Sequence, residues 1–485
     1  MTIKDLNPKI VWNNFYLLTL CPRPSKHEEV VREFLLSWGK EHGVDVSADK
    51  TGNVIMRAPA TKGYEKRRGV ILQAHMDMVP QKTADTVHDF LKDPIQTQVL
   101  GEWLGAKGTT LGADDGIGVA LAMSVMEDKS LEHGPVEVLI TYDEETGMTG
   151  ANKLESGLFK GDILLNIDSE EEGELCIGCA GGLDGLADFR YRTYATPEGY
   201  AAYQIVVKGL QGGHSGMDIS LYRANANRIV ARVLLPLLEK YGVKVSYING
   251  GSLRNAIPFE GEAQVLVPQE NVAAVKKVVK GIFADVKAEY QDTDPGAAFH
   301  FEKMDKVPAR YIQPKVILNV VKAILACPAG VERMSPTMPG LTETSTNLAI
   351  VRCGKGHITV HSLMRSSVNS AKADLAERMR CVFELAGASF STSGGYSGWI
   401  PKPDTPVYKV ISDVWKQVSG KDMKISATHG GLECALLGEK YPSWEMASIG
   451  PTIVHPHSPD ERVKIDTVGN AWEFLKALLK AIPEK

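Results

Sequence analysis

Histidine and acidic side chains follow several short apolar runs near the two ends of the chain. In "GVILQAHMDMVP", His75 and Asp77 come after the apolar run 70–72, and residues two apart in an extended strand project from the same face. Three later runs end in similar groups, namely Asp143, Glu144 and Glu145 after 136–142, Asp168 after 163–167, and His455 and His457 after 444–454. Because ligands bind at the carboxyl ends of the strands in open α/β sheets, we expect these side chains to converge on one edge.

The pair Asp114 and Asp115 in "LGADDGIGVALAM" directly precedes a predicted helix. Two interpretations are open, because Asp is a favoured N-cap residue and also a metal ligand. Glu144 and Glu145 alone would fit a solvated turn, and His75 alone would fit a buried histidine with satisfied hydrogen bonds. The number of acids favours a metal site. Carboxylates packed together without a cation raise one another's pKa, and these stretches contain no Arg or Lys.

The donor types point to two divalent cations. If His75, Asp114, Glu145, Asp168 and His457 are ligands, their three carboxylates carry a charge of −3, which two divalent ions and one hydroxide balance and a single ion does not. Mixed imidazole and carboxylate ligands suit Zn²⁺, with Co²⁺ or Mn²⁺ as substitutes. Ca²⁺ and Mg²⁺ prefer oxygen ligands and fit two imidazoles poorly.

The elements that would carry these groups form an α/β pattern at both ends of the chain. Residues 27–190 alternate helical stretches with short apolar strands, and this pattern returns after the turn-rich segment 391–406. Longer alternating strands and three or four helices between them predict an α+β insertion. We therefore predict a catalytic domain at 1–192 and 395–485 and an inserted domain at 193–394.

Two segments of the insertion, "RNAIPFEGEAQVLV" and "TNLAIVRCGKGHITVHS", have a similar pattern, and each precedes a predicted helix. This similarity agrees with a duplicated strand-helix-strand-strand-helix unit. It agrees nearly as well with coincidence between two ordinary α+β segments.

Composition excludes several classes of partner. Hydrophobic residues make up 44% of the 485 residues and charged residues 23%, which is typical of a soluble globular protein long enough for two domains. The net charge of −5 predicts no nucleic-acid or membrane partner, and no apolar run is long enough for a membrane span. Seven scattered cysteines and an N-terminus without a signal pattern predict reduced thiols and a cytoplasmic location. The sequence leaves open whether the chain is a monomer or a homodimer.

The motifs "HMD", "GADD", "DEETG", "NIDSE", "GGHSG" and "HPHSPDE", in this order, resemble those of the aminoacylase/carnosinase-type two-zinc metallopeptidases, from about residue 10 to the C-terminus. The resemblance implies an α/β, two-zinc exopeptidase-like catalytic domain with an inserted α+β lid domain. "AHMDMVPQK", "LGADDGIGVA" and "HGGLECALL" are most similar to the branch of bacterial cytosolic dipeptidases that act on aminoacyl-histidine peptides. Gly116 departs from many relatives, which have Lys there, so the role of that lysine cannot be transferred.

The resemblance implies a role for each predicted ligand. His75 and Asp168 would bind one Zn²⁺, Glu145 and His457 would bind the other, and Asp114 would bridge them. This arrangement gives two Zn²⁺ per chain.

The resemblance also assigns the groups beside the ions. From the residues alone either Glu144 or Glu145 could be the base, since adjacent carboxylates hardly reach the same atom. The family pattern makes Glu144 the general base. Asp77 would hold the second ring nitrogen of His75 and fix its tautomer.

In the lid domain the resemblance implies three substrate contacts. His214 in "GLQGGHSG" would stabilise the tetrahedral oxyanion, Asn255 in "RNAIP" would make a polar contact, and Arg365 in "SLMRSSV" would bind the substrate carboxylate. Without the resemblance, His214 would be a solvated turn residue and Arg365 a surface residue of a strand.

The implied function is hydrolysis of dipeptides with free amino and carboxyl ends, including Xaa-His and β-Ala-His. A related metal-dependent N-acyl amino acid deacylase or an aminotripeptidase is the alternative. Asp168 favours the dipeptidase over a deacylase, because relatives that accept a free amino terminus tend to have Asp at this position. A non-enzymatic binding protein would be expected to lose Glu144 or a ligand, and here every position is filled.

Overall fold

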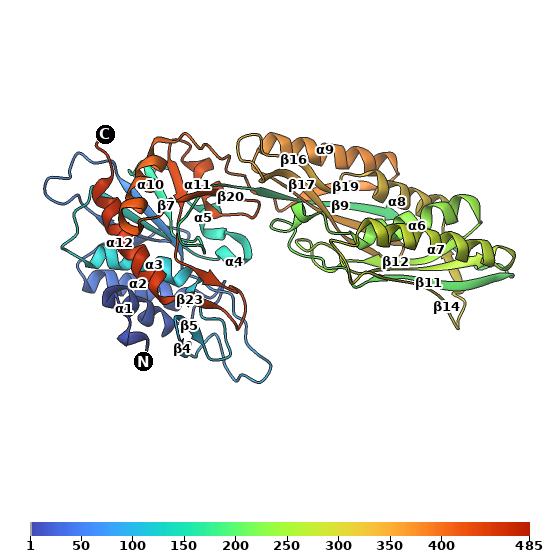
Figure 1. Ribbon diagram of the computed structural model, residues 1–485, viewed down its shortest axis with the longest axis horizontal. Coiled ribbons are helices and arrows are strands. Elements are labelled where there is room, and N and C mark those ends of the chain that lie inside the picture. Colours follow the sequence, from blue (N-terminus) through green and yellow to red (C-terminus); the bar gives the residue numbers. More distant parts are fainter. Residues whose placement is uncertain (1) are drawn as a thin grey trace. The chain divides into compact units, whose positions relative to one another are not determined.

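The computed structural model describes residues 2–485, which divide into two compact units (Figure 1). The outer unit comprises the chain up to Gly178, Pro401–Ala427 and Leu432–Lys485. The inserted unit comprises Cys179–Ile400 and Thr428–Gly431. Segments near both ends of the chain therefore build one unit.

The boundaries between the units differ from the predicted positions 192/193 and 394/395. They lie at 178/179 and 400/401, and the short segment 428–431 also belongs to the inserted unit. The first boundary lies before strand β9 (Gly181–Arg190), because this strand hydrogen-bonds to strands of the inserted unit on both sides. The sequence "ELCIGCAGGLDGLADFR" runs from one unit into the other without a polar linker, so no change of composition marks this boundary.

The outer unit contains an eight-stranded sheet in the order β1-β2-β6-β3-β7-β21-β8-β20. Strands β6, β3, β7 and β21 are parallel, and β1 and β2 extend the sheet as antiparallel strands. Every residue of β3, β6 and β7 is buried, which explains their continuous apolar sequences. The strands are β1 (Asp45–Ala48), β2 (Val54–Ala58), β3 (Val70–His75), β6 (Val136–Thr141), β7 (Ile163–Asn166), β8 (Glu174–Cys179), β20 (Lys424–Thr428) and β21 (Glu445–Ser448).

A smaller sheet of the outer unit has the order β22-β23-β5-β4. Its strands are β4 (Thr97–Leu100), β5 (Trp103–Ala106), β22 (Ile453–Val454) and β23 (Arg462–Lys464). It pairs a segment near residue 105 with one near residue 463, and so brings the C-terminal "HPHSPDE" segment close to the loop that precedes Asp114.

Helix α3 lies at the centre of the helical layer and contacts α1, α12 and β3. All its residues from 113 to 126 are buried, which fits a sequence that is apolar on every side. The helices of this unit are η1 (Ile3–Asp5), α1 (Lys9–Thr19), α2 (Glu29–Glu41), α3 (Ala113–Glu127), α4 (Glu144–Gly147), α5 (Thr149–Lys153), α10 (Pro406–Ser419), α11 (Glu433–Lys440) and α12 (Ile465–Ala481). No helix within residues 2–485 is long and apolar enough to cross a membrane.

The inserted unit is built on one nine-stranded sheet, with the path β14-β11-β13-β12-β17-β18-β9-β19 and β16 paired to β17. The strands are β9, β11 (Tyr200–Lys208), β12 (Lys244–Gly250), β13 (Gly261–Pro268), β14 (Ala298–Lys303), β16 (Gly330–Met334), β17 (Thr342–Gly354), β18 (His357–Ser366) and β19 (Ser389–Ser393). A separate pair joins β10 (Thr193–Ala195) to β15 (Arg310–Ile312).

The two halves of this sheet have the same internal order. The first half has the order β14-β11-β13-β12 and the second has β19-β9-β18-β17. In the first half the chain runs strand-helix-strand-strand-helix-strand, from β11 to β14. The second half has the same succession if β16 is set aside, but the whole first half is inserted between its first strand β9 and its first helix α8. Strands β12 and β17 join the halves through one pairing of Gly250 with Val351. The helices are η2 (Ile219–Leu221), α6 (Ala226–Lys240), η3 (Gln269–Asn271), α7 (Val272–Glu289), α8 (Pro314–Ala326) and α9 (Asn369–Leu385).

Candidate active site

Two overlapping groups of possible metal ligands lie in the outer unit, where parallel strands end. The ligand atoms of His75, Asp114 and Asp168 lie within 4.8 Å of one another, and so do those of Asp114, Glu145 and His457. His75 is the last residue of β3, and Asp168 and Glu145 follow the neighbouring strands β7 and β6. The structure thus brings together all five residues that the sequence predicted as ligands.

Asp114 belongs to both groups, and its two oxygens face different histidines. Oδ1 lies 3.1 Å from Nε2 of His75, and Oδ2 lies 3.1 Å from Nε2 of His457. The remaining pairs are His75 Nε2 to Asp168 Oδ1 at 3.4 Å and His457 Nε2 to Glu145 Oε2 at 3.0 Å. Tetrahedral ligands of Zn²⁺, at bond lengths near 2.1 Å, lie about 3.4 Å apart. Both groups therefore fit a divalent cation, with Asp114 between the two.

An unpartnered atom supports the same interpretation. Glu145 Oε1 is buried and has no hydrogen-bond partner among residues 2–485. A buried carboxylate oxygen without a donor is costly unless a cation compensates it. The donor set and its spacing thus suit two cations that accept imidazole and carboxylate ligands.

The histidines and carboxylates of the cluster shift one another's pKa, so that protons offset part of the negative charge. Hydrogen bonds with Asp114 and Glu145 raise the pKa of His457 to about 11. Burial lowers the pKa of His75, but the nearby acidic groups Asp168 and Asp114 outweigh burial and hold that pKa well above its usual range. Burial raises the pKa of Asp168 to about 6.

We expect metal loading to release protons from this cluster. The neighbouring carboxylates raise the pKa of both histidines and so favour the protonated imidazoles, whereas an imidazole must be neutral to bind a metal. Protons compete more strongly as the pH falls, so metal affinity should fall with it. Calorimetric titration of the metal-free protein with Zn²⁺ in two buffers of different ionisation enthalpy counts the protons. Zinc binding without proton release at pH 7 would contradict this charge balance.

A buried carboxylate from the C-terminal part holds the loop of Asp114. Glu461 Oε2 accepts the main-chain N–H groups of Leu111 and Gly112 at 2.8 and 2.9 Å. Its Oε1 accepts those of Ala113 and Asp114 at 2.7 and 3.2 Å. The side chain is only 2% exposed. This role was not predicted from the sequence, where Glu461 is the last letter of "HPHSPDE" and its partners lie nearly 350 positions away.

We expect Glu461→Gln to destabilise the protein and weaken metal binding. The amide can accept from two of the four N–H groups and leaves the others facing its own NH₂. Each buried donor left unsatisfied costs about 1–3 kcal/mol in the free energy of unfolding. Denaturant unfolding and zinc titration measure both effects. Asp460→Asn, at the exposed neighbouring position, is the matched control, and equal behaviour of the two variants would show that Glu461 does not hold the loop.

Asp115 takes the capping role that the sequence left open for the pair. Its Oδ1 accepts the N–H of Gly118 at 3.1 Å, inside the first turn of α3, and its Oδ2 accepts the N–H of His75 at 3.2 Å. Asp114 makes no such cap, and the peptide bond between Asp114 and Asp115 is cis. The two adjacent acids therefore have different surroundings. Asp115 accepts main-chain hydrogen bonds from helix α3 and strand β3, whereas Asp114 lies between His75 and His457.

Gly116 leaves room for a buried arginine. A Cβ atom at this position would lie 2.5 Å from Nη2 of Arg23. The Arg23 side chain is 2% exposed and donates from Nη1 to the main-chain oxygens of Met76 and Asp77 at 3.1 and 3.0 Å. One cation thus lies beside the acidic cluster, although none was visible in the predicted site stretches.

Asp77 positions the segment that follows β6. Its Oδ1 accepts the N–H of Glu144 at 3.0 Å and its Oδ2 accepts the N–H of Glu145 at 3.3 Å. His75 Nδ1 lies 3.5 Å from Asp77 Oδ1, which is beyond normal hydrogen-bond distance. Glu144 lies with His75 and Glu145 within 4.8 Å, and burial raises its pKa well above its usual range. A carboxyl with a raised pKa can hold and release a proton, which is the property that a general acid–base group needs.

Buried polar side chains link the strands that end at the site. Gln73 Nε2 and Thr141 Oγ1 donate to Glu433 Oε2 at 2.6 and 2.5 Å, and Asn166 Nδ2 donates to Gln73 Oε1 at 2.6 Å. Glu433 is fully buried, and burial raises its pKa to about 8. These contacts tie β3, β6 and β7 together just before their carboxyl ends, a role for Glu433 that the sequence analysis missed.

A further acidic group, Glu28, Asp77 and Asp143, also lies within 4.8 Å. Main-chain donors account for it: Glu28 Oε1 accepts the N–H groups of Lys26 and Asp143 at 2.7 and 3.1 Å. It therefore needs no metal ion to explain its burial.

In the inserted unit, Arg365 is 5% exposed and has no carboxylate partner within residues 2–485. Its Nε donates to Ser215 Oγ at 3.4 Å and its Nη1 donates to Tyr396 Oη at 3.3 Å. Arg365 is thus buried, whereas the sequence pattern alone would indicate a surface residue. A buried guanidinium without a counter-charge suits a carboxylate ligand, which its planar fork can bind with two hydrogen bonds.

His214 and Asn255 lie in adjoining loops of the inserted unit. His214 Nδ1 accepts the N–H groups of Gly216 and Met217, both at 3.3 Å, so the neutral ring carries its proton on Nε2. Burial and the charge of Arg365 lower the pKa of His214, which favours this neutral form. The Asn255 side chain is exposed, and its main-chain oxygen accepts the N–H of Ser215 at 2.8 Å.

The sequence analysis missed a buried histidine of the inserted unit, His429, as a candidate site residue. His429 is 5% exposed, its Nε2 lies 2.7 Å from Ser345 Oγ, and its Nδ1 has no partner within residues 2–485. Burial, with the charge of Arg365, lowers its pKa to about 3. The motif "HGGLECALL" contained His429, but nothing in its spacing placed it beside Arg365.

Comparison with known proteins identifies the family. The chain is 41% identical over 483 residues to the cytosol non-specific dipeptidase of Escherichia coli K12, which covers 100% of this chain and 99% of the relative. The crystal structure of aminoacylhistidine dipeptidase from Vibrio alginolyticus matches with a TM-score of 0.93 and 44% identity, over 100% of this chain and 99% of that one. Aminopeptidase PepT of Bacillus cereus shares the fold, with a TM-score of 0.62 and 16% identity over 98% and 99% of the two chains. The family model described as peptidase family M20/M25/M40 matches residues 71–481, which confirms the predicted resemblance. The chain belongs to this peptidase family and has its mixed α/β fold.

Proposed function

We propose that the protein is a cytoplasmic dipeptidase that uses two Zn²⁺ per chain to hydrolyse dipeptides with free amino and carboxyl ends, Xaa-His and β-Ala-His included. The observation that carries this proposal is the position of Asp114, whose two oxygens face the histidines of two separate ligand groups. Glu144, a carboxyl with a raised pKa, belongs to the same cluster. The full-length similarity to proteins named as dipeptidases supports the substrate class.

The ligands in this proposal are His75 and Asp168 for one ion, Glu145 and His457 for the other, and Asp114 for both. Two divalent cations held there would polarise the scissile carbonyl and acidify a water molecule. Co²⁺ and Mn²⁺ offer the same ligand preferences and are expected to substitute.

The chain's own groups carry the protons and orient the reaction. Glu144 takes a proton from the attacking water and passes it to the leaving amine. Asp77 holds the N–H groups of Glu144 and Glu145, and so fixes the direction of the base relative to the ligand next to it. His214 donates Nε2–H to the developing oxyanion.

Arg365 is the proposed partner of the substrate's terminal carboxylate, and Asn255 adds a polar contact. The guanidinium is buried and already oriented by Ser215 and Tyr396, so little entropy is lost when a carboxylate binds. The acidic cluster of the outer unit attracts the substrate's ammonium group. A dipeptide carries the terminal carboxylate and the ammonium group that these side chains would recognise.

We expect the C-terminal amide of a good dipeptide to be hydrolysed at least about 30-fold more slowly, in kcat/KM, than the free acid, because a buried charge then loses its partner. Arg365→Ala should slow the acid and leave the amide nearly unchanged, which removes the difference. Arg352→Ala, an exposed arginine on strand β17 of the same sheet, should keep it. Equal rates for acid and amide with the unaltered enzyme would rule out Arg365 as the carboxylate partner.

A substrate panel tests the proposed function as a whole. The zinc-loaded protein is assayed with Ala-His, β-Ala-His, a tripeptide and an N-acetyl amino acid. We expect hydrolysis of the dipeptides and none of the other two. Preferred cleavage of the tripeptide would instead identify an aminotripeptidase, and preferred cleavage of the N-acetyl compound would identify a deacylase.

A further inference from the structure

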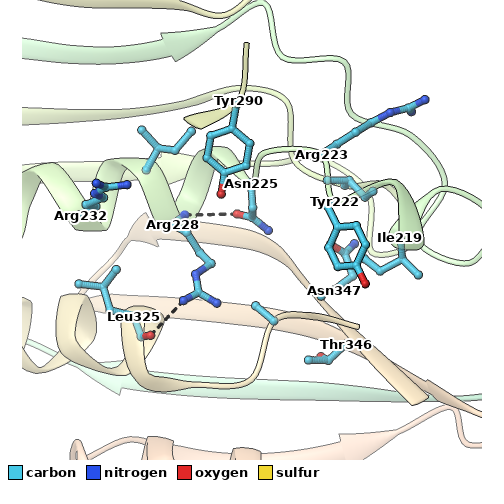
Figure 2. Close-up of a pocket in the computed structure, with 14 residues that line it drawn as sticks. Ile219, Tyr222, Arg223, Asn225, Arg228, Arg232, Tyr290, Leu325, Thr346 and Asn347 are labelled. Carbon is cyan, nitrogen blue, oxygen red and sulfur yellow. Dashed lines mark hydrogen bonds between the residues drawn. The ribbon is translucent and has the colours of Figure 1, made fainter. Parts of the chain in front are cut away.

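A cavity of about 330 Å³ lies within the inserted unit, between helix α6, the η2 segment, strand β17 and the end of helix α8 (Figure 2). All its lining residues belong to this unit. Three of them are arginines, Arg223, Arg228 and Arg232, and none is acidic. None of the residues proposed above for catalysis or substrate contact lines it.

The three arginines differ in how their charge is compensated. Arg232 forms two hydrogen bonds with the carboxylate of Glu289, at 2.5 and 2.8 Å. Arg223 has Asp218 at 3.7 Å. Arg228 donates Nη2 to the main-chain oxygen of Leu325 at 3.2 Å and has no carboxylate partner within residues 2–485 (Figure 2). One partly buried cation therefore faces the cavity without a counter-charge.

Apolar side chains form another part of the cavity wall. They include Ile219, Ile229 and Ile257, together with the ring of Tyr290. The cavity thus offers a cation without a counter-charge and apolar surface around it.

We propose that this cavity is a binding site for a small organic carboxylate, with the carboxylate head on Arg228 and an apolar body between the isoleucines and Tyr290. An anion compensates the Arg228 charge and can accept hydrogen bonds from its guanidinium. A neutral ligand of the same shape would supply neither counter-charge nor a strong acceptor.

The walls of the cavity also hold the loops of His214 and Asn255. Asn347 Nδ2 donates to the main-chain oxygens of Arg254 and Ala256 at 3.1 and 2.7 Å, on either side of Asn255. The N–H of Ile257 donates to the oxygen of Gly213 at 2.8 Å, next to His214. A ligand that packs against these walls therefore restrains both loops and changes the KM for peptides. This coupling rests on the proposed function, whereas the binding site does not.

Calorimetric titration of the zinc-loaded, full-length protein with 3-phenylpropanoate tests the site, with 3-phenylpropanamide as the neutral comparison. We expect the acid to bind one per chain and the amide at least about tenfold more weakly, as for a lost charged hydrogen bond. Arg228→Gln should weaken the acid by a similar factor.

Two control variants show where the probe binds. Arg232→Gln, one turn along α6 and already paired with Glu289, should keep the affinity of the unaltered protein. Arg365→Ala should keep it as well. The proposal is overturned if acid and amide bind alike, if Arg228→Gln binds as tightly as the unaltered protein, or if only Arg365→Ala loses binding.

The coupling has its own measurement. Saturating 3-phenylpropanoate should shift the KM of dipeptide hydrolysis at least twofold in the unaltered enzyme and leave Arg228→Gln unchanged. Binding of the probe without any change in KM would contradict the coupling but would still support the binding site. A protein that hydrolyses none of the test peptides would contradict the proposed function, and the calorimetric result would still decide the site.

Discussion

Glu144→Gln is expected to abolish peptide hydrolysis while the protein still binds two metal ions. The substitution removes the proton carrier and keeps the size and packing of the side chain, and Glu144 lies outside the two ligand groups that share Asp114. Loss of a general acid–base group costs about 10²- to 10⁴-fold in rate. Turnover of a dipeptide and metal analysis of the same preparation measure both parts of the expectation.

Glu145→Gln is the matched control for this result. The two glutamates are adjacent, but Glu145 Oε2 lies 3.0 Å from Nε2 of His457 in one ligand group. We expect Glu145→Gln to bind less metal, in contrast to Glu144→Gln. If Glu144→Gln lost a metal ion and Glu145→Gln kept both, the roles of the two residues would be reversed. Near-normal turnover by Glu144→Gln would exclude it as the base.

Asp114→Ala is expected to weaken both metal ions at once. Its two oxygens face His75 and His457 separately, so the substitution removes one ligand from each group. Residues that only hydrogen-bond to a metal ligand typically contribute about 10- to 100-fold in metal affinity. Loss of a ligand itself should cost more, hence about 100-fold or more in the affinity for each ion. His457→Ala removes a ligand from one group and should leave the other ion bound. Metal analysis after dialysis distinguishes the variants, and two tightly bound ions in Asp114→Ala would contradict the shared ligand.

The sequence predicted most residues of the candidate metal site because they stand near strand ends. His75, Asp168 and Glu145 each follow a continuous apolar run, and such runs predict buried parallel strands whose carboxyl ends meet at one edge. Asp114 precedes a predicted helix instead, where a helix cap was an equally open interpretation, and only the family resemblance assigned it to both ions.

The supporting groups could not be predicted, because their partners are remote in the sequence. Glu461 satisfies a loop nearly 350 residues before it, and Glu433 bonds to Gln73 across 360 positions. Each is one acidic residue among 59 Asp and Glu residues, and no local pattern distinguishes a buried acid from a solvated one. The burial of Arg365 could not be predicted either. Its strand pattern indicates a surface position, and only the structure shows it buried, with Ser215 and Tyr396 packed around it.

The most direct test of the two-ion peptidase is a zinc titration of the metal-free protein with activity measured at each step. Protein stripped with a chelator is titrated with Zn²⁺, and hydrolysis of Ala-His is followed beside the amount of zinc bound per chain. We predict no activity without metal and full activity only when two ions are bound, since each of the two ligand groups that share Asp114 could hold one ion. Hydrolysis by the metal-free protein, or full activity at one ion per chain, would contradict the account.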